Sequence, residues 1–154
     1  MNSFMQTSID EARHGITHNH GGPFGAVIVR DGEIISRAHN QVLKTNDPTA
    51  HAEVLAIRQA SSVLGKFDLS DCELYTTSQP CPMCLAAIFW ARIKTVYYGS
   101  DKEDVAKIGF DDSLFYDLIR GQNMDHELEM VNIDREASLQ LLKLWEKKPD
   151  RKMY

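Results

Sequence analysis

The sequence predicts an α/β fold: a three-layer α/β/α sandwich around a central five-stranded mixed sheet. Three observations support this prediction. A helical apolar pattern opens the chain, a β-hairpin signal follows it, and strand-like and helix-like segments then alternate. A hairpin supplies antiparallel strands, whereas strands joined through helices pair in parallel. We therefore expect a mixed sheet with helices on both faces.

The first elements are a helix and the two strands of a hairpin. Residues 3–18 are expected to be helical because their apolar positions recur at helical spacing. Two apolar runs, 24–30 and 33–40, flank Asp31-Gly32. Both residues of this dipeptide reach positive φ readily, which makes it a strong hairpin signal.

The next helix is expected to start at Asp47-Pro48 and to end near Gly65. Asp is a favoured N-cap, and Pro fits the first helical position, where no backbone N–H is needed. The later segments follow from their apolar periodicity. Their expected order is strand 72–77, helix 80–92, strand 95–99, helix 112–119, strand 128–133 and helix 134–147.

Length and composition indicate a single globular domain, residues 1–154, with 43% hydrophobic and 25% charged residues. The formal net charge of −5 argues against a nucleic-acid partner, because polynucleotide binding usually needs a basic surface. No apolar run is long enough to cross a bilayer, and no secretory signal is visible, so we expect a cytoplasmic protein. Three cysteines then favour a metal site or catalysis over a disulfide framework.

The stretch Pro80-Cys81-Pro82-Met83-Cys84 places two cysteines three positions apart at a predicted helix start. Their sulfurs can face one point, and a helix N-terminus favours the thiolate form. Zn²⁺ accepts both sulfur and imidazole ligands, and His51, near the start of another helix, is the expected third ligand. Three protein ligands leave a position for water, which is the arrangement of a catalytic zinc site.

Glu53 follows His51 by two residues, and His-x-Glu with Pro-Cys-x-x-Cys is the signature of zinc nucleobase deaminases. In that signature the glutamate is a general acid and base, not a metal ligand. We therefore expect Glu53 to move protons while a metal-activated water displaces an amine. The other histidines have no ligand spacing to the cysteine pair and are expected to be surface or hydrogen-bonded residues: His14, His18, His20, His39 and His126.

Over nearly its whole length the sequence resembles the cytidine-deaminase-like superfamily and, within it, the small bacterial guanine deaminases. The metal motifs belong to the superfamily, whereas Gly-Gly-Pro-Phe-Gly at 21–25 and Gly-Phe-Asp-Asp at 109–112 resemble the guanine branch. The resemblance implies a five-stranded sheet between helices and one Zn²⁺ per subunit. One departure is Gln79, where the family usually has Glu before Pro-Cys; the change removes a charge beside the thiolates.

The resemblance also implies roles for residues outside the metal motifs. Asn40 would hydrogen-bond the purine edge, and Phe24 would stack on the ring, although a core aromatic is an equal alternative for Phe24. Asp112 would be a second acid that meets the exocyclic amine; its alternative is a helix N-cap. The backbone N–H of Ala52 and the ring of Trp90 are further candidates for substrate binding.

The C-terminal segment, about 134–154, consists of the expected helix 134–147 and of residues 147–154, which would ordinarily be a frayed basic tail. In the guanine deaminases that the sequence resembles, this segment is exchanged between subunits and its last residue closes the partner's site. The resemblance therefore implies a homodimer in which Tyr154 is a shared site residue.

The expected function is zinc-dependent hydrolysis of guanine, a small nucleobase, to xanthine and ammonia in purine salvage or breakdown. The same metal motifs also serve tRNA adenosine deaminases, and the net negative charge argues against that alternative. Cytosine or an aminotriazine remains open as the substrate. A zinc-stabilised nucleotide-binding module without catalysis is the alternative from another class, and it has no need for Glu53.

Overall fold

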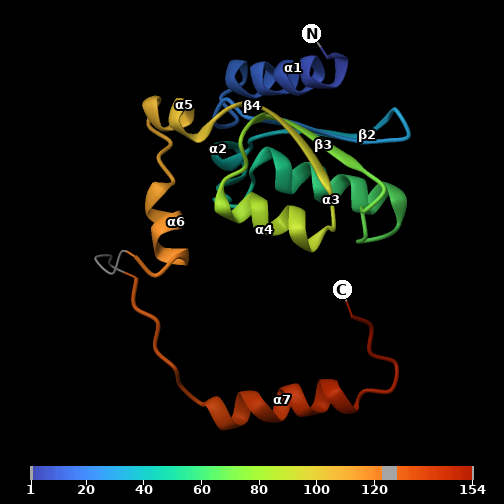
Figure 1. The fold of residues 1–154 in the computed structure, drawn as a ribbon, viewed down its shortest axis with the longest axis vertical. Coiled ribbons are helices and arrows are strands. Elements are labelled where there is room, and N and C mark those ends of the chain that lie inside the picture. The colour runs from blue at the N-terminus through green and yellow to red at the C-terminus, as the bar shows by residue number, and fades with distance from the viewer. Residues whose placement is uncertain (1, 123–127, 154) are drawn as a thin grey trace.

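The structure is a computed structural model that describes residues 2–122 and 128–153. These two stretches contain seven helices and four strands (Figure 1). In chain order they are α1 (Ser3–Thr17), β1 (Gly25–Arg30), β2 (Glu33–His39), α2 (Val42–Thr45), α3 (Ala52–Leu64), β3 (Glu73–Ser78), α4 (Pro82–Trp90), β4 (Thr95–Ser100), α5 (Lys102–Lys107), α6 (Ser113–Ile119) and α7 (Arg135–Lys147).

The sheet has the strand order β2-β1-β3-β4, and helices cover both of its faces (Figure 1). Strand β1 is antiparallel to β2 and β3, whereas β3 and β4 are parallel, so the sheet is mixed as predicted. Helix α1 packs on one face; α3 and α4 lie on the other (Figure 1). Alternate residues of β1 serve the two faces: Ala26 and Ile28 pack with α3, while Val27 and Val29 pack with Phe4 of α1.

The prediction of a fifth strand was wrong, because the sheet formed by the described residues has four strands. Residues 128–133 have no regular secondary structure. A strand needs a neighbour for its backbone hydrogen bonds, and this segment instead runs away from the sheet (Figure 1). Its apolar side chains stay exposed, from 65% for Leu128 to 88% for Met130.

The predicted helix start at Asp47-Pro48 was also wrong, because α3 begins at Ala52. The Asp47 carboxylate accepts hydrogen bonds from the backbone N–H and the hydroxyl of Thr49, at 2.8 and 2.7 Å. This is an Asx-turn, which offers the backbone an alternative to a helix cap. The short helices α2 and α5 were not predicted.

Backbone geometry explains two local features near the N-terminus. Asp31 and Gly32 have φ values of 52° and 79°, which confirms the predicted hairpin turn. Gly25 starts β1 directly beneath α1, where a Cβ atom would lie 2.0 Å from the carbonyl oxygen of Ser8. A larger residue at Gly25 would therefore push α1 off the sheet.

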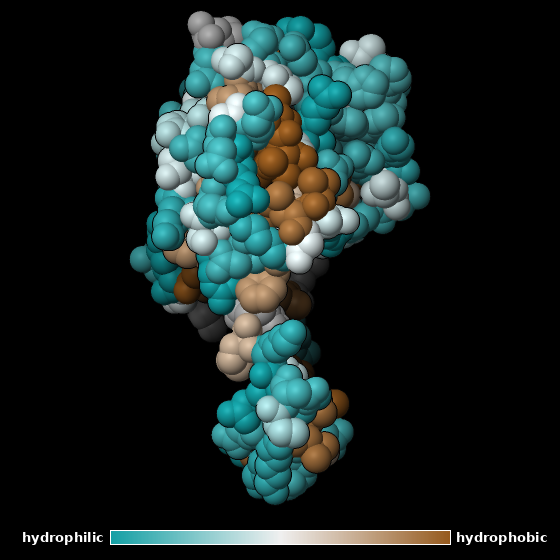
Figure 2. Space-filling model, turned by 90° about the vertical axis from the view of Figure 1, so that its right-hand side faces the viewer, coloured by the Kyte–Doolittle hydropathy of each residue, from teal (hydrophilic) through white to brown (hydrophobic). Residues whose placement is uncertain are grey.

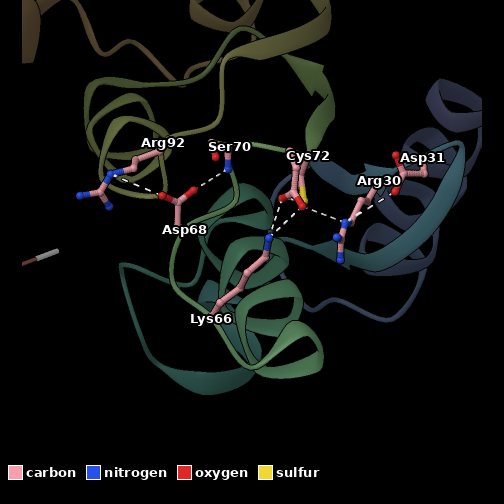
Figure 3. Close-up of polar contacts among 8 residues, drawn as sticks. Arg30, Asp31, Lys66, Asp68, Ser70, Cys72 and Arg92 are labelled. Carbon is pink, nitrogen blue, oxygen red and sulfur yellow. Dashed lines mark hydrogen bonds and ion pairs between the residues drawn. The ribbon is translucent and has the colours of Figure 1, made fainter.

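The two ends of the sheet differ in chemistry. One end of the sheet carries ion pairs where β1 ends and where the loop between α3 and β3 runs (Figure 3). The pairs join Arg30 to Asp31 and Asp71, and Lys66 to Asp71. At the opposite end, β3 and β4 finish and the N-termini of α3 and α4 come together. Ligands of open α/β sheets bind at the carboxyl ends of parallel strands, so the second end is where a site is expected.

We call residues 2–122 the body and residues 128–153 the arm. The arm leaves the body after α6, and its helix α7 lies apart from the sheet and its covering helices (Figure 1). In the space-filling view the arm forms the lower lobe, with hydrophobic residues along one side (Figure 2). Among the described residues, no helix combines the length and hydrophobicity that a membrane span requires.

Candidate active site

Two helix N-termini hold the cluster that the metal motifs predict. His51 is the N-cap of α3 and Cys81 is the N-cap of α4, and neither side chain caps its own helix. Cys84 lies three positions after Cys81 on the first turn of α4. The positive ends of both helix dipoles therefore point towards the sulfur atoms, which stabilises thiolates.

The three side chains converge on one point. Nδ1 of His51 lies 3.6 Å from Sγ of Cys81 and 3.5 Å from Sγ of Cys84. Two sulfurs and one imidazole nitrogen at this spacing form a donor set suited to Zn²⁺, whose bonds to such ligands are about 2.0–2.3 Å long. Cys84 is buried and the other two are half-buried, so His51, Cys81 and Cys84 fit a zinc site that opens on one side.

The protonation of these groups is strongly coupled. The hydrogen bond from the Cys84 thiol lowers the pKa of Cys81 to about 4, and the same bond raises the pKa of Cys84. The pKa of His51 is raised chiefly by its hydrogen bond to Cys81. The thiolate form is therefore favoured at Cys81, and a divalent cation bound here would favour loss of the proton from Cys84 as well.

Glu53 lies on the first turn of α3 with its carboxyl group buried beside the sulfurs. Thr76 Oγ1 donates a hydrogen bond to Glu53 Oε1 at 3.3 Å, and the Cys84 thiol donates to Oε2 at 3.4 Å. Burial raises the pKa of this carboxyl group, with a further contribution from the charge of Cys81. A carboxyl group whose pKa is raised by burial is suited to accept and return a proton near neutral pH.

A cavity of about 480 Å³ opens over this cluster. His51, Glu53 and Cys81 lie in its lining, and its walls are largely apolar. This combination of apolar walls with a few convergent polar groups is typical of small-molecule sites. The volume accommodates a single heterocyclic base.

Asn40 lines the same cavity from the end of β2. Its side-chain oxygen accepts hydrogen bonds from the backbone N–H groups of Gly22 and Val42, at 3.3 and 3.2 Å. Because the oxygen is used in this way, the amide NH₂ group is the part left to meet a ligand. The geometry therefore makes Asn40 a donor to an acceptor atom of the ligand.

Phe24 and Asp112 also line the cavity. The Phe24 ring contacts Phe110 edge to face, with centroids 5.1 Å apart and planes at 83°. Asp112 stands at the N-cap of α6, but its side chain makes no cap hydrogen bond; instead, Asp111 accepts from the backbone N–H of Ser113. Burial, together with the charge of Cys81, raises the pKa of Asp112.

The remaining candidates are Ala52, Trp90 and Tyr154. Ala52 is fully buried at the first position of α3, where its backbone N–H has no intrahelical partner. Trp90 ends α4 and lines a different cavity of about 490 Å³, together with Met153 of the arm. Tyr154 is outside the described residues.

Sequence reasoning missed two features of the cavity. Phe110 and Phe115 complete its aromatic wall. The Gly-Phe-Asp-Asp stretch was a sequence signal for Phe110, and no signal pointed to Phe115. The backbone N–H of Lys102, at the start of α5, donates to Gln79 Oε1 at 3.4 Å. The signal for α5 was Asp101 followed by Asp104, which form a capping box.

Residues 1–100 match the family model described as the cytidine and deoxycytidylate deaminase zinc-binding region. The chain is 44% identical to guanine deaminase of Bacillus subtilis over 152 residues, which cover 99% of this chain and 97% of that protein. It is 35% identical to a tRNA-specific adenosine deaminase of Aquifex aeolicus, over 94% of this chain and 93% of the relative.

Solved structures show the same similarity. The X-ray structure of the Bacillus subtilis guanine deaminase superposes with a TM-score of 0.93 and covers 100% of this chain and 99% of that one. A structure of guanine deaminase from Nitrosomonas europaea gives a TM-score of 0.67 at 31% identity, covering 71% of this chain and 64% of its own. The first superposition includes the arm, so the arm follows a similar course in that structure.

Proposed function

The chain belongs to the family of the cytidine and deoxycytidylate deaminase zinc-binding region, and on that premise we propose that it hydrolyses guanine to xanthine and ammonia. The observation that carries this proposal is the full-length similarity to a guanine deaminase, joined to a cavity whose floor is the cluster of His51, Glu53 and Cys81. Free guanine, a planar base without sugar or phosphate, suits a cavity with apolar walls.

One Zn²⁺ per subunit would be held by His51, Cys81 and Cys84. Zinc with three protein ligands supplies a nucleophile at neutral pH, because it lowers the pKa of a coordinated water toward ~7. The two cysteines must remain reduced to serve as ligands, which suits a cytoplasmic enzyme. The thiolate charges offset the charge of the cation and leave the site close to neutral.

Glu53 would carry protons between the water and the base. It takes one proton from the water that attacks C2 of guanine and returns it to the neighbouring ring nitrogen. It then takes the second proton of the same oxygen and passes it to the departing amine, which leaves as ammonia. Its hydrogen bond from Thr76 holds one carboxyl oxygen, so the other faces the sulfurs and the reacting atoms.

Asp112, which also lines the cavity, would meet the exocyclic amine. Its side chain is not used as a helix cap, and its raised pKa increases the fraction that carries a proton. A protonated carboxyl group beside the amine assists its departure, whereas a fixed carboxylate orients the amine by accepting its N–H. In either protonation state, the proposed role of Asp112 is to contact the leaving amine.

Asn40 would select guanine through its amide NH₂ group, which can donate to the carbonyl at C6 or to a ring nitrogen. Adenine has an amine at C6, which would leave this donor opposite another donor. A buried polar group without a partner costs about 1–3 kcal/mol, so the wrong base is rejected. Phe24 and Phe110 would form the aromatic wall against the ring plane.

The arm would be exchanged between the two subunits of a homodimer. Its large apolar residues are exposed within a single chain, at 67% for Leu141, 61% for Leu142 and 67% for Leu144. Surfaces of this kind are normally covered, and exchange of an identical element between protomers covers them symmetrically. Tyr154, which follows the arm in sequence, would then close the partner's cavity.

Ammonia release from the zinc-loaded protein tests the proposed reaction, with guanine, adenine, cytosine and an adenosine-containing tRNA anticodon stem-loop offered in parallel. Turnover of guanine with little or none of the others is expected. Activity on the RNA alone would overturn the proposal in favour of the tRNA-specific relatives, and activity on cytosine alone would favour another small heterocycle.

A further inference from the structure

Four histidines lie close together outside the proposed active site. His14 is on α1, His18 and His20 follow the end of that helix, and His39 ends β2. Their rings contact one another in a cluster: the centroids of His14 and His18 are 4.1 Å apart, and those of His20 and His39 are 5.0 Å apart. None of these residues is used in the proposed reaction.

Three of them bring nitrogen atoms to a common point. The ligand atoms of His14, His20 and His39 all lie within 4.8 Å of one another, and His20 Nδ1 is 2.8 Å from His39 Nε2. Tetrahedral Zn²⁺ with bonds of about 2.0–2.1 Å to imidazole needs its ligand nitrogens roughly 3.3 Å apart. Small rotations of these side chains therefore meet that requirement.

A carboxylate orients the buried member of the three. Glu11 Oε2 lies 3.0 Å from Nδ1 of His39, which directs Nε2 of the same ring into the cluster. Glu11 is itself held by Arg37, whose Nε lies 3.5 Å from Oε1. Metal-binding histidines characteristically use their second nitrogen for a carboxylate or carbonyl in this way, because it fixes the tautomer and the ring.

We propose that His14, His20 and His39 form a second metal site, which takes a divalent transition-metal ion of the Zn²⁺ class, with Glu11 orienting His39. Imidazole nitrogens favour Zn²⁺, Ni²⁺ and Cu²⁺ over Mg²⁺ and Ca²⁺, which prefer oxygen. The pKa of His20 is lowered by burial and then by Lys44 and the other histidines, which favours the neutral imidazole that a metal needs. Water completes the coordination, since His14 is exposed.

The second site adjoins the wall of the cavity. His39 directly precedes Asn40, and the carbonyl oxygen of His20 accepts hydrogen bonds from the backbone N–H groups of Leu43 and Lys44, both at 3.0 Å. An ion shared by α1, the loop after it and β2 would therefore brace the segment that positions Asn40. The site is independent of the proposed substrate.

Zinc content after equilibrium dialysis against Zn²⁺ tests the proposal, with the full chain prepared without a histidine tag. Wild-type protein is expected to hold two zinc ions per chain, whereas His14→Asn and His20→Asn are expected to hold one. His14 is exposed, so its replacement leaves the core intact. His51→Ala is the reciprocal control and should lose the other ion while keeping this one.

NMR of the imidazole nitrogens complements the number of zinc ions per chain. Addition of the second equivalent of Zn²⁺ should shift the imidazole ¹⁵N signals of His14, His20 and His39 in wild-type protein, with little change at His51. One zinc per wild-type chain would overturn the proposal. So would two zinc ions in both His14→Asn and His20→Asn, because the second ion would then lie elsewhere.

Discussion

The body of the chain has a buried apolar core, whereas none of the described residues of the arm is buried. In the body, α3 presents Ala52, Ala56 and Ala60 to the sheet, and all three are completely buried. In the arm, Met130 and Ile133 are 88% and 71% exposed. Full burial of one large aliphatic side chain is worth about 1.5–3 kcal/mol, so the arm forgoes stabilisation that the body obtains.

In the proposed homodimer, the body folds through contacts within its own chain, and the arm packs on the second chain. The proposed zinc ligands and Glu53 come from the N-terminal ends of two helices, α3 and α4, of the body. The large apolar side chains of the arm are not buried against the body of the same chain. In the proposed exchange, a second chain would cover them. In the proposed homodimer the body would therefore supply the chemistry, and the arm would close the partner's site.

Glu53→Gln should have the largest effect on turnover, a loss of at least ~10²-fold, because it keeps the side-chain shape and removes proton transfer. Zinc content should stay at the wild-type level. Steady-state ammonia release and metal analysis on the same preparation check both points. Cys84→Ala is the matched comparison and should lose the catalytic zinc as well as the activity. A fully active Glu53→Gln protein would exclude Glu53 as the proton carrier.

Asn40→Ala should lower kcat/KM for guanine by about 10–100-fold, because one hydrogen bond to the base is removed. Zinc content should again be unchanged. The backbone groups of Gly22 and Val42 lose their acceptor in this variant, so Asn40→Asp, which keeps the acceptor and removes the donor, is the sharper test. If Asn40→Asp turned over guanine at the wild-type rate, donation by Asn40 would be excluded.

Deletion of residues 150–154 should remove most of the activity while the body keeps its zinc. If the arm closes the partner's site, mixing this deletion variant with Glu53→Gln should restore activity. One site of each mixed dimer then combines an intact Glu53 with an intact arm from the other chain. Ammonia release after co-refolding or co-expression measures the recovery.

The two variants alone are the controls for that mixing experiment, and each should remain weakly active. Should the arm instead act on its own body, no site in the mixture would hold both intact parts, and mixing would restore nothing. Full activity of the deletion variant on its own would exclude any role for the arm's end in turnover.

The sequence predicted that His51, Cys81 and Cys84 lie together, because the determinants of this cluster are local. Cys81 and Cys84 share one helical turn, and His51 and Glu53 share another, so spacing alone describes each half. The sheet then brings the N-termini of α3 and α4 together, as is common in α/β folds. Helix boundaries were less predictable, as Asp47 shows: its carboxylate serves a turn instead of a cap.

Features that depend on long-range packing could not be predicted. His14, His20 and His39 have no motif spacing, and only the packing of α1 beside the end of β2 brings them together. Residues 128–133 have the apolar alternation of a strand, but a strand also needs a neighbour, and none lies beside them among the residues described for this chain. Sequence periodicity reports the pattern and carries no information on the pairing partner.

The smallest expected effect concerns the far end of the body, where Asp71 accepts from Lys66 at 2.8 Å and pairs with Arg30 at 2.9 Å (Figure 3). The hydrogen bond from Lys66, above all, lowers the pKa of Asp71 below its ordinary 3.8. A lowered pKa stabilises the fold above the unfolded-state value and loses this effect as pH falls through the folded-state value. Asp71→Asn should therefore lower Tm by at most a few degrees at pH 7, with the difference from wild type shrinking below about pH 4. Thermal unfolding of both proteins across that pH range measures the difference in Tm, with the more exposed Asp31→Asn as the control. If the difference in Tm persisted in acid, the charge of Asp71 would not be its cause.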